Sequence, residues 1–138
     1  MEYMPSGVPG PEPSFDDREY WERCQQKRLA FQACSACGKC RHPPGPYCPH
    51  CSSDQITWVE APTGGELFRY TVIYHPAHES VRSRVPYNVV IVAFPDLGVR
   101  VISNVVNAAP DELQFGMPLK LVWGQASNGQ AIPLFEKM

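Results

Sequence analysis

Four of the six cysteines form two Cys-x-x-Cys pairs that are separated by ten residues. The first pair is Cys34 and Cys37, and the second is Cys48 and Cys51. Each pair has the spacing of a tight turn whose two thiolates face one ion, and two such turns complete a tetrahedron. Structural Zn²⁺ binds four thiolates at about 2.3 Å and leaves no position for a water molecule. The spacing therefore predicts one structural zinc ion per chain and no hydrolytic chemistry at it.

Two alternatives share this cysteine pattern. Four thiolates also hold iron–sulfur centres, and two Cys-x-x-Cys pairs can form disulfides in an oxidising compartment. Residues 38–47, between the pairs, are rich in Gly and Pro and predict turns rather than a long insertion. Zinc is the interpretation that the spacing favours.

The two remaining cysteines are not expected to bind the metal. Cys40 continues the spacing as Cys34-x-x-Cys37-x-x-Cys40. Gly38 directly after Cys37 supplies the permissive backbone that the turn needs, and use of Cys40 would leave Cys34 spare. Cys24 falls in a predicted helix, where we expect a small buried or idle thiol. No basic neighbour that would activate it can be assigned from the sequence.

Length and charge limit the classes of protein. A chain of 138 residues supports one domain, or one domain with a small metal module. The net charge of −2 and the pI near 6.1 speak against a nucleic-acid binder, which usually has a basic face. No apolar run approaches the ~18 residues of a membrane span, and the first residues lack the features of a signal peptide. We expect a cytoplasmic protein with reduced cysteines and no membrane segment.

The first half of the chain predicts a helix and a small sheet around the cysteines. Residues 1–13 alternate prolines and glycines and predict a disordered tail or linker, which would also suit the seam to an upstream domain. Ser14 is a good N-cap for a helix over residues 15–28. Residues 29–33 and 56–59 flank the cysteines and predict paired strands. The helix and zinc ribbon are assigned to residues 14–62.

From residue 63 to residue 138 the pattern changes to β-strands. Thr63-Gly64-Gly65 predicts a hinge-like turn, and the segments that follow are rich in β-branched and aromatic residues. Five strands with one short helical insertion before the fourth predict a small closed antiparallel barrel, an OB-fold. The strands are expected at residues 66–74, 87–94, 99–106, 119–123 and 131–135, and the insertion at residues 109–115.

The order of these motifs resembles a known family. The motifs are Trp21, the two cysteine pairs, Pro43-Pro44, Gly65-Glu66-Leu67-Phe68-Arg69-Tyr70-Thr71-Val72, Pro86-Tyr87, Gly98-Val99-Arg100-Val101 and Gly116-Met117-Pro118. Over about residues 15–135, the chain resembles the acyl-CoA-associated family in which a rubredoxin-like zinc ribbon precedes an OB-fold. That family was long catalogued as a domain of unknown function. Cys40 and the run Ala61-Pro62-Thr63 depart from its usual pattern.

The resemblance implies a companion subunit of a thiolase-superfamily enzyme. Family members accompany acetyl-CoA acetyltransferase and hydroxymethylglutaryl-CoA synthase in archaea, and thiolase-like aldolases in bacterial steroid side-chain degradation. In the steroid case, the module can be fused to a hot-dog-fold enoyl-CoA hydratase. We therefore expect a non-catalytic subunit of an acyl-CoA lyase (aldolase) or acyltransferase. Its role would be to stabilise the partner and to complete the acyl-CoA site, with acyl-CoA reached through the partner.

No catalytic constellation stands out in the chain itself. The sequence contains no glycine-framed nucleophile, metalloprotease motif or phosphate loop, so we assign no catalytic residue. The alternative function is single-stranded nucleic-acid binding, in which OB-fold aromatic residues stack on bases. The low positive charge removes most of the electrostatic affinity of such binding. The candidates considered for acid–base work are His42, His50, His75 and His78.

Surface contacts are expected on the helix, one loop and one strand. In the loop over residues 75–85, Arg82 and Arg84 are suited either to a partner or to CoA phosphates, because guanidinium binds phosphate in a bidentate way. A solvated loop is the equal alternative. Aromatic and arginine side chains usually carry most of the interface energy. The candidate partner contacts are Tyr20, Trp21, Phe68, Tyr70 and Arg84.

Overall fold

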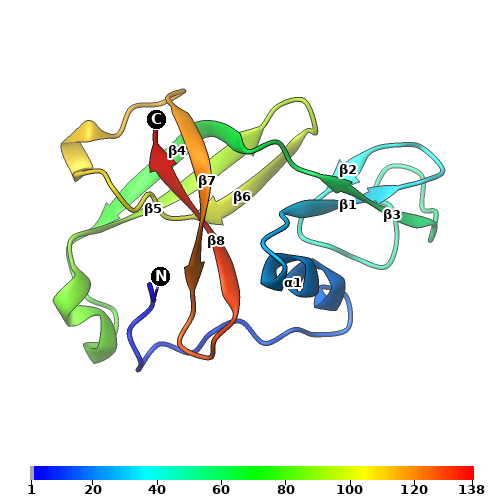
Figure 1. Cartoon of the computed structure of the whole chain (residues 1–138). Helices are drawn as coiled ribbons and strands as arrows, with labels where there is room; N and C mark the ends of the chain where they lie inside the picture. Colours follow the sequence, from blue (N-terminus) through cyan, green and yellow to red (C-terminus); the bar gives the residue numbers. More distant parts are fainter. Residues whose placement is uncertain (1) are drawn as a thin grey trace.

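The chain folds into a small three-stranded sheet with one helix beside it and a curled five-stranded sheet (Figure 1). The structure is a computed structural model that describes residues 2–138. In chain order, the elements are α1 (Arg18–Gln25), β1 (Ala30–Cys34), β2 (Cys40–Arg41), β3 (Ile56–Glu60), β4 (Gly64–Ile73), the 3-10 helix η1 (Glu79–Arg84), β5 (Tyr87–Phe94), β6 (Val99–Ser103), the 3-10 helix η2 (Pro110–Glu112), β7 (Pro118–Gln125) and β8 (Ala131–Lys137).

Helix α1 is shorter than the predicted helix at both ends. At the start, the backbone N–H and the hydroxyl of Ser14 both donate to Asp17 Oδ1, at 2.7 and 3.0 Å. Ser14 thus forms a turn before the helix, and Asp17 takes the N-cap position. At the end, Lys27 adopts the left-handed conformation with φ of 60°, and its N–H donates to Cys24 O. A residue in that conformation ends an α-helix.

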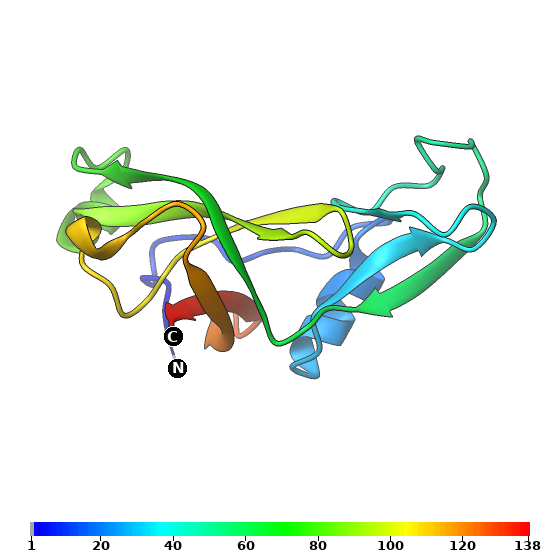
Figure 2. The same cartoon turned by 90° about the horizontal axis from the view of Figure 1, so that it is seen from above.

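The ribbon sheet has the strand order β2-β1-β3 and is antiparallel throughout. The pairing of β1 with β3 confirms the predicted ribbon strands, and the two-residue β2 was not predicted. All five residues of β1 are buried, because α1 and the curled sheet cover this strand. Figure 2 shows the ribbon and the curled sheet end to end, joined by the chain that leads from β3 into β4.

The five-stranded sheet has the order β6-β5-β4-β7-β8 and the predicted OB-fold arrangement, with η2 before the fourth strand. The sheet curls until the chain after β6 meets β8. There, Val106 N–H donates to Phe135 O at 2.8 Å, and Phe135 N–H donates to Asn104 O at 3.1 Å. These few contacts form a parallel bridge, so the sheet is a half-barrel closed over a short stretch.

Gly64 and Gly65 lie inside β4, although the sequence predicted a hinge there. Gly64 pairs with Lys120, and Gly65 pairs with Leu119. A Cβ atom on Gly65 would lie 2.7 Å from Ala93 O, and one on Gly64 would lie 2.6 Å from Leu119 O. The two glycines therefore permit a close strand approach rather than a flexible turn.

One hydrophobic core connects the ribbon to the half-barrel. The ring of Phe31 in β1 lies 5.3 Å from that of Phe94 in β5, which in turn lies 6.2 Å from Phe135 in β8. All three side chains are fully buried. Burial of a Phe side chain stabilises a fold by roughly 1.5–3 kcal/mol, so these contacts hold the two sheets together.

Residues 2–13 lie along the half-barrel, where the sequence predicted a disordered tail. Tyr3 N–H donates to Gln125 O at 3.0 Å, and Asn128 Nδ2 donates to Pro11 O at 2.9 Å. Tyr3, Met4 and Val8 face the η1 region, where a cavity of about 320 Å³ opens between the two segments. The prolines exclude a helix, as expected, but they leave the carbonyl groups free to accept these hydrogen bonds.

Candidate metal centre and partner surface

Two matching turns hold the four cysteines of the predicted site. In the first, Gly38 N–H donates to Cys34 O at 2.7 Å; in the second, Ser52 N–H donates to Cys48 O at 2.8 Å. Both turn residues have positive φ, at 82° and 64°. Gly38 adopts this conformation readily, whereas Ser52 adopts it against the usual preference of an L-residue.

The four sulfur atoms converge on one point. All lie within 4.8 Å of one another, and the sulfur atoms of two pairs, Cys34 with Cys51 and Cys37 with Cys48, are 3.6 Å apart. Zinc–sulfur bonds of about 2.3 Å in a tetrahedron place sulfurs about 3.8 Å apart. The residues therefore fit a structural zinc ion, which all four thiolates would hold.

Backbone groups favour the thiolate form at this centre. The N–H groups of Cys37 and Ala36 lower the pKa of the Cys34 thiol to about 6. Zinc binds thiolates, so a depressed pKa reduces the free-energy cost of deprotonation on binding. Cys34 and Cys48 are buried, whereas Cys37 and Cys51 face solvent. The centre is thus anchored to the sheet on one side and open to water on the other.

Cys40 and Cys24 lie outside the group of four sulfurs. Cys40 sits on β2, half-buried against the core, and burial raises the pKa of its thiol. Cys24 is completely buried in α1, and burial raises the pKa of its thiol to about 12. A thiol with a raised pKa is a poor nucleophile at neutral pH. The predicted buried position of Cys24 is confirmed.

The histidines occupy unrelated positions. His42 is half-buried with its ring 5.0 Å from that of Tyr20 and 5.3 Å from that of Phe31. Burial lowers the pKa of His42 to about 4, and its Nδ1 is buried without a hydrogen-bond partner among residues 2–138. His50 donates its backbone N–H, not its ring, to Cys48 Sγ. His78 bonds Ser80 on the exposed η1 turn.

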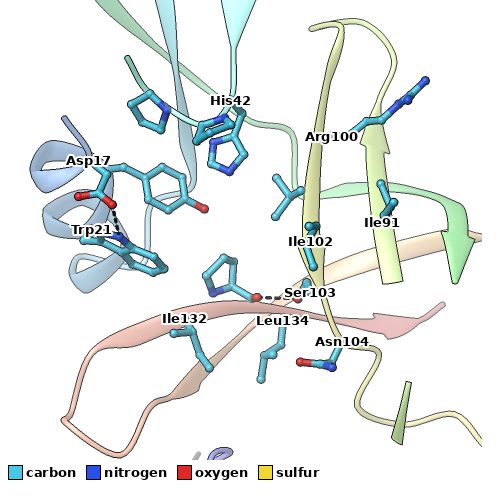
Figure 3. A pocket seen from close by; sticks show the side chains of 15 residues that line it. Asp17, Trp21, His42, Ile91, Arg100, Ile102, Ser103, Asn104, Ile132 and Leu134 are labelled. Carbon is cyan, nitrogen blue, oxygen red and sulfur yellow. Dashed lines mark hydrogen bonds between the residues drawn. The ribbon is translucent and has the colours of Figure 1, made fainter. Parts of the chain in front are cut away.

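A cavity of about 610 Å³ opens along the seam between α1, the ribbon and the half-barrel. Figure 3 shows Trp21 of α1 on one side, His42 of the ribbon above, and Ile102 of β6 opposite. Ile132 and Leu134 of β8 form the floor, and most of the lining is apolar. Sequence reasoning missed this cavity, because its walls come from segments far apart in the chain.

The two predicted contacts on the helix differ in exposure. Tyr20 is only 4% exposed and belongs to the core, so its prediction as a partner contact is wrong. An apolar stripe on a short helix first covers the helix's own core. Trp21 is half-buried, packs edge-on against Tyr20 at 5.0 Å and donates Nε1–H to Asp17. It borders the seam cavity, and its contact with a partner stays a prediction.

The predicted contacts on the half-barrel are partly occupied within the chain. Tyr70 is half-buried, with its ring 5.4 Å from that of Phe115. Phe68 is half-buried beneath Arg69 and Arg100. Both arginines lie in motifs quoted above, yet the sequence suggested no role for either. The position of Arg100 between two valines, Val99 and Val101, was the one sequence signal that its side chain faces outward from the strand.

The two arginines of the loop are both exposed, but their surroundings differ. Arg82 forms an ion pair with Glu79 at 2.8 Å, so its charge is already balanced. Arg84 lies 5.9 Å from the ring of Tyr3 in the N-terminal segment. Their binding to CoA or to a partner stays a prediction. Across residues 2–138, no helix combines the length and apolar character needed to cross a bilayer.

The four-thiol centre and the curled sheet define a zinc-ribbon/OB-fold protein. Residues 21–57 match the family model described as the rubredoxin-like zinc ribbon domain of ChsH2, and residues 58–124 match the C-terminal OB-fold domain of ChsH2. This chain belongs to the family that these domains define, also known as DUF35.

Relatives with curated names fall into two groups. The chain is 40% identical over 127 residues to a probable enoyl-CoA hydratase alpha subunit of Thermomonospora curvata. It is 28% identical over 119 residues to the 3-oxo-4,17-pregnadiene-20-carboxyl-CoA hydratase alpha subunit of Mycobacterium tuberculosis. These matches cover 91% and 86% of this chain but only 39% and 37% of the relatives. A scaffold protein of Methanothermobacter thermautotrophicus is 29% identical, with 75% of this chain and 77% of that protein covered.

Solved structures agree with the fold. A chain of the Ltp2-ChsH2(DUF35) aldolase superposes with a TM-score of 0.84 at 38% identity, and the match covers 93% of this chain and 98% of that one. A protein of unknown function from the DUF35 family of Sulfolobus solfataricus gives a TM-score of 0.63 at 19% identity, covering 87% and 83%. The second match supports the fold alone.

Proposed function

We propose that this chain is a non-catalytic companion subunit of a thiolase-superfamily acyl-CoA lyase, or of a related acyltransferase. The observation that carries the proposal is the near-complete match to a chain of an assembly named as an aldolase. The relative named as a scaffold protein supports the same role. In this role the half-barrel stabilises the partner and completes its acyl-CoA site, while the partner supplies the nucleophile or base.

We propose in addition that the acyl group is a steroid side chain and that the protein is cytoplasmic. The relative whose name contains a pregnadiene carboxyl-CoA supports steroid side-chain degradation as the setting. A hot-dog-fold hydratase is then a second companion, since two hydratase subunits contain a region similar to this chain. The protein acts in the cytoplasm, where the six cysteines stay reduced.

The test compares the thiolase-superfamily protein from the same genome with and without this chain. We expect the two proteins to co-purify at a fixed ratio, and carbon–carbon bond cleavage or formation on a steroid acyl-CoA to depend on the complex. This chain alone is expected to leave the substrate unchanged. A partner that is stable and fully active alone would contradict the proposal, as would turnover by this chain alone.

A further inference from the structure

Two arginine side chains share one aromatic ring on the outer face of the half-barrel. Arg69 Cζ lies 4.6 Å and Arg100 Cζ lies 3.8 Å from the centroid of the Phe68 ring. Arg69 also lies 4.9 Å from the ring of Phe115, which is 63% exposed. We call these four residues the Phe68 patch. Its guanidinium groups are held over rings, so less side-chain entropy is lost when they bind a ligand.

A β-bulge in β4 brings the patch together. Leu67 pairs with Val92 and the next pair joins Arg69 to Ile91, so Phe68 is the extra residue. Regular alternation would place Phe68 and Arg69 on opposite faces of the sheet. With the bulge, Leu67 is fully buried while Phe68 and Arg69 both reach the surface. Bulges that redirect side chains occur frequently at functional sites.

Strand β6 supplies the other side of the patch. Arg100 and Ile102 alternate outward between buried neighbours, and Ile102 is 74% exposed. Figure 3 shows the Arg100 guanidinium directed away from the seam cavity. Ile102 pairs with Ile91, which pairs with Arg69. Ile91 and Ile102, which also line the edge of the seam cavity, therefore lie on the same face of the sheet as Arg69.

No carboxylate among residues 2–138 forms an ion pair with the two arginines of the patch. Over the described residues 2–138, neither Arg69 nor Arg100 forms an ion pair, whereas Arg23, Arg28 and Arg82 each bind a glutamate. Glu66 lies on the same face, because its cross-strand partner Ala93 also pairs with Arg100. Within the described part of the chain, Glu66 forms no ion pair with either arginine. Arg69 donates one hydrogen bond to Phe68 O at 2.6 Å, and no described carboxylate pairs with it or with Arg100. Two such guanidinium groups beside exposed apolar side chains, on a chain of net charge −2, are suited to an acidic ligand.

We infer that the Phe68 patch docks an acidic segment of the partner protein. Carboxylates of that segment accept hydrogen bonds from Arg69 and Arg100, and its apolar side chains pack on Phe115 and Ile102. Arginine and aromatic residues are enriched among the hot-spot residues that carry most of the binding energy of protein interfaces. Nucleic acid is the less suitable occupant, because two guanidinium groups neutralise few phosphates. This inference rests on the proposed function and names the surface that holds the partner.

The test reverses both charges in the full chain, as R69E/R100E. The probes are the thiolase-superfamily protein from the same genome, an oligoglutamate peptide and oligothymidylate. We expect the Kd for the protein partner to rise by roughly tenfold to a hundredfold, and the wild-type affinity to fall with added salt. The matched control R28E/K120E makes the same change in net charge outside the patch and should stay within about twofold of wild type. Zinc content and circular dichroism check folding.

Each outcome decides one claim. Partner binding by R69E/R100E at the wild-type affinity overturns the patch and leaves the proposed function intact. If the wild-type chain does not bind the partner, the proposed function fails, and the oligoglutamate titration decides the patch alone. If R69E/R100E then loses the oligoglutamate binding of the wild-type chain, the Phe68 patch is supported as the acidic-ligand site. If both proteins bind oligoglutamate equally, the patch is overturned. Tighter binding of oligothymidylate than of oligoglutamate at physiological salt, lost in the same variant, makes nucleic acid the occupant and overturns the inference.

Discussion

Strand β3 of the ribbon has no fully buried residue, whereas β5 of the half-barrel buries every second side chain. The half-barrel therefore has the alternation of a sheet that closes over an apolar core. The turns of the ribbon instead converge on four sulfur atoms. The comparison indicates that the half-barrel derives its stability from apolar burial, and that the turns of the ribbon derive theirs from the metal.

Strand β1 belongs to both regions. It lies in the ribbon sheet and is buried over its whole length, and its Phe31 contacts Phe94 of the half-barrel. We therefore expect the ribbon to have a turn region that depends on zinc and an inner strand that depends on the shared core.

Removal of a zinc ligand should have the largest effect. Structural zinc contributes on the order of 10 kcal/mol or more in zinc-finger peptides, so Cys37→Ser should abolish zinc binding and unfold the turns. The half-barrel should keep its strand signal in circular dichroism, because its core lies elsewhere. Elemental analysis provides the readout, with Cys40→Ser as the matched control that keeps one zinc per chain. Iron in the wild-type chain, or metal loss in the control, would contradict the ligand assignment.

Truncation of the shared core should affect both regions together. Phe31→Ala removes a fully buried ring between the sheets, which typically costs about 3–5 kcal/mol. Urea unfolding should show this loss in a single transition for ribbon and half-barrel, and Phe31→Leu should lose less. Two separate transitions in the wild-type chain would mean that β1 does not couple the regions.

The seam should weaken as the pH falls. Burial holds the pKa of His42 at about 4, below its ordinary value of 6.5. Between these two values the unfolded chain binds a proton that the folded chain does not, so stability falls with falling pH. The full loss is roughly 3 kcal/mol at about 1.36 kcal/mol per pKa unit, and it stops below pH 4.

His42→Phe isolates this contribution. The variant keeps a ring against Tyr20 and Phe31 and lacks the titrating group, while zinc ligands titrate equally in both proteins. We expect the difference in unfolding free energy between the two proteins to change across this pH range. A constant difference would show that His42 is protonated as readily in the fold as in the unfolded chain.

The parts of the fold that depend on local pattern were predictable. The cysteine spacing located the metal centre, and the apolar run of β5 located a strand buried in the core. The two-residue β2 was missed, because its pairing depends on the turn between the cysteines. Helix α1 was predicted too long, since the Ser14–Asp17 turn competes with helix formation in a way that propensity does not show.

The surface was less predictable than the core. Aromatic residues were chosen as contacts by type, but Tyr20 is buried because α1 packs on its own chain. The Phe68 patch depends on a bulge whose position follows from strand register rather than from composition. From the sequence, Arg69 was noted only as part of a motif, and the bulge in β4 is what brings its side chain to the surface together with Phe68.

Residues 2–13 form a third region, held by neither the metal nor the central core. The alternating prolines predicted a disordered tail or linker, whose deletion would leave the melting temperature nearly unchanged. In the structure, the Tyr3 N–H donates to Gln125 O, and burial raises the pKa of the Tyr3 hydroxyl.

Deletion of residues 2–11 removes these contacts and should lower the free energy of unfolding by about 1–2 kcal/mol, which is the smallest effect expected here. Zinc content should stay at one ion per chain, because the segment contacts the half-barrel rather than the ribbon. Tyr3→Ala in the full chain should reproduce part of the loss, and a melting temperature unchanged by both variants would show that the segment contributes nothing to the half-barrel.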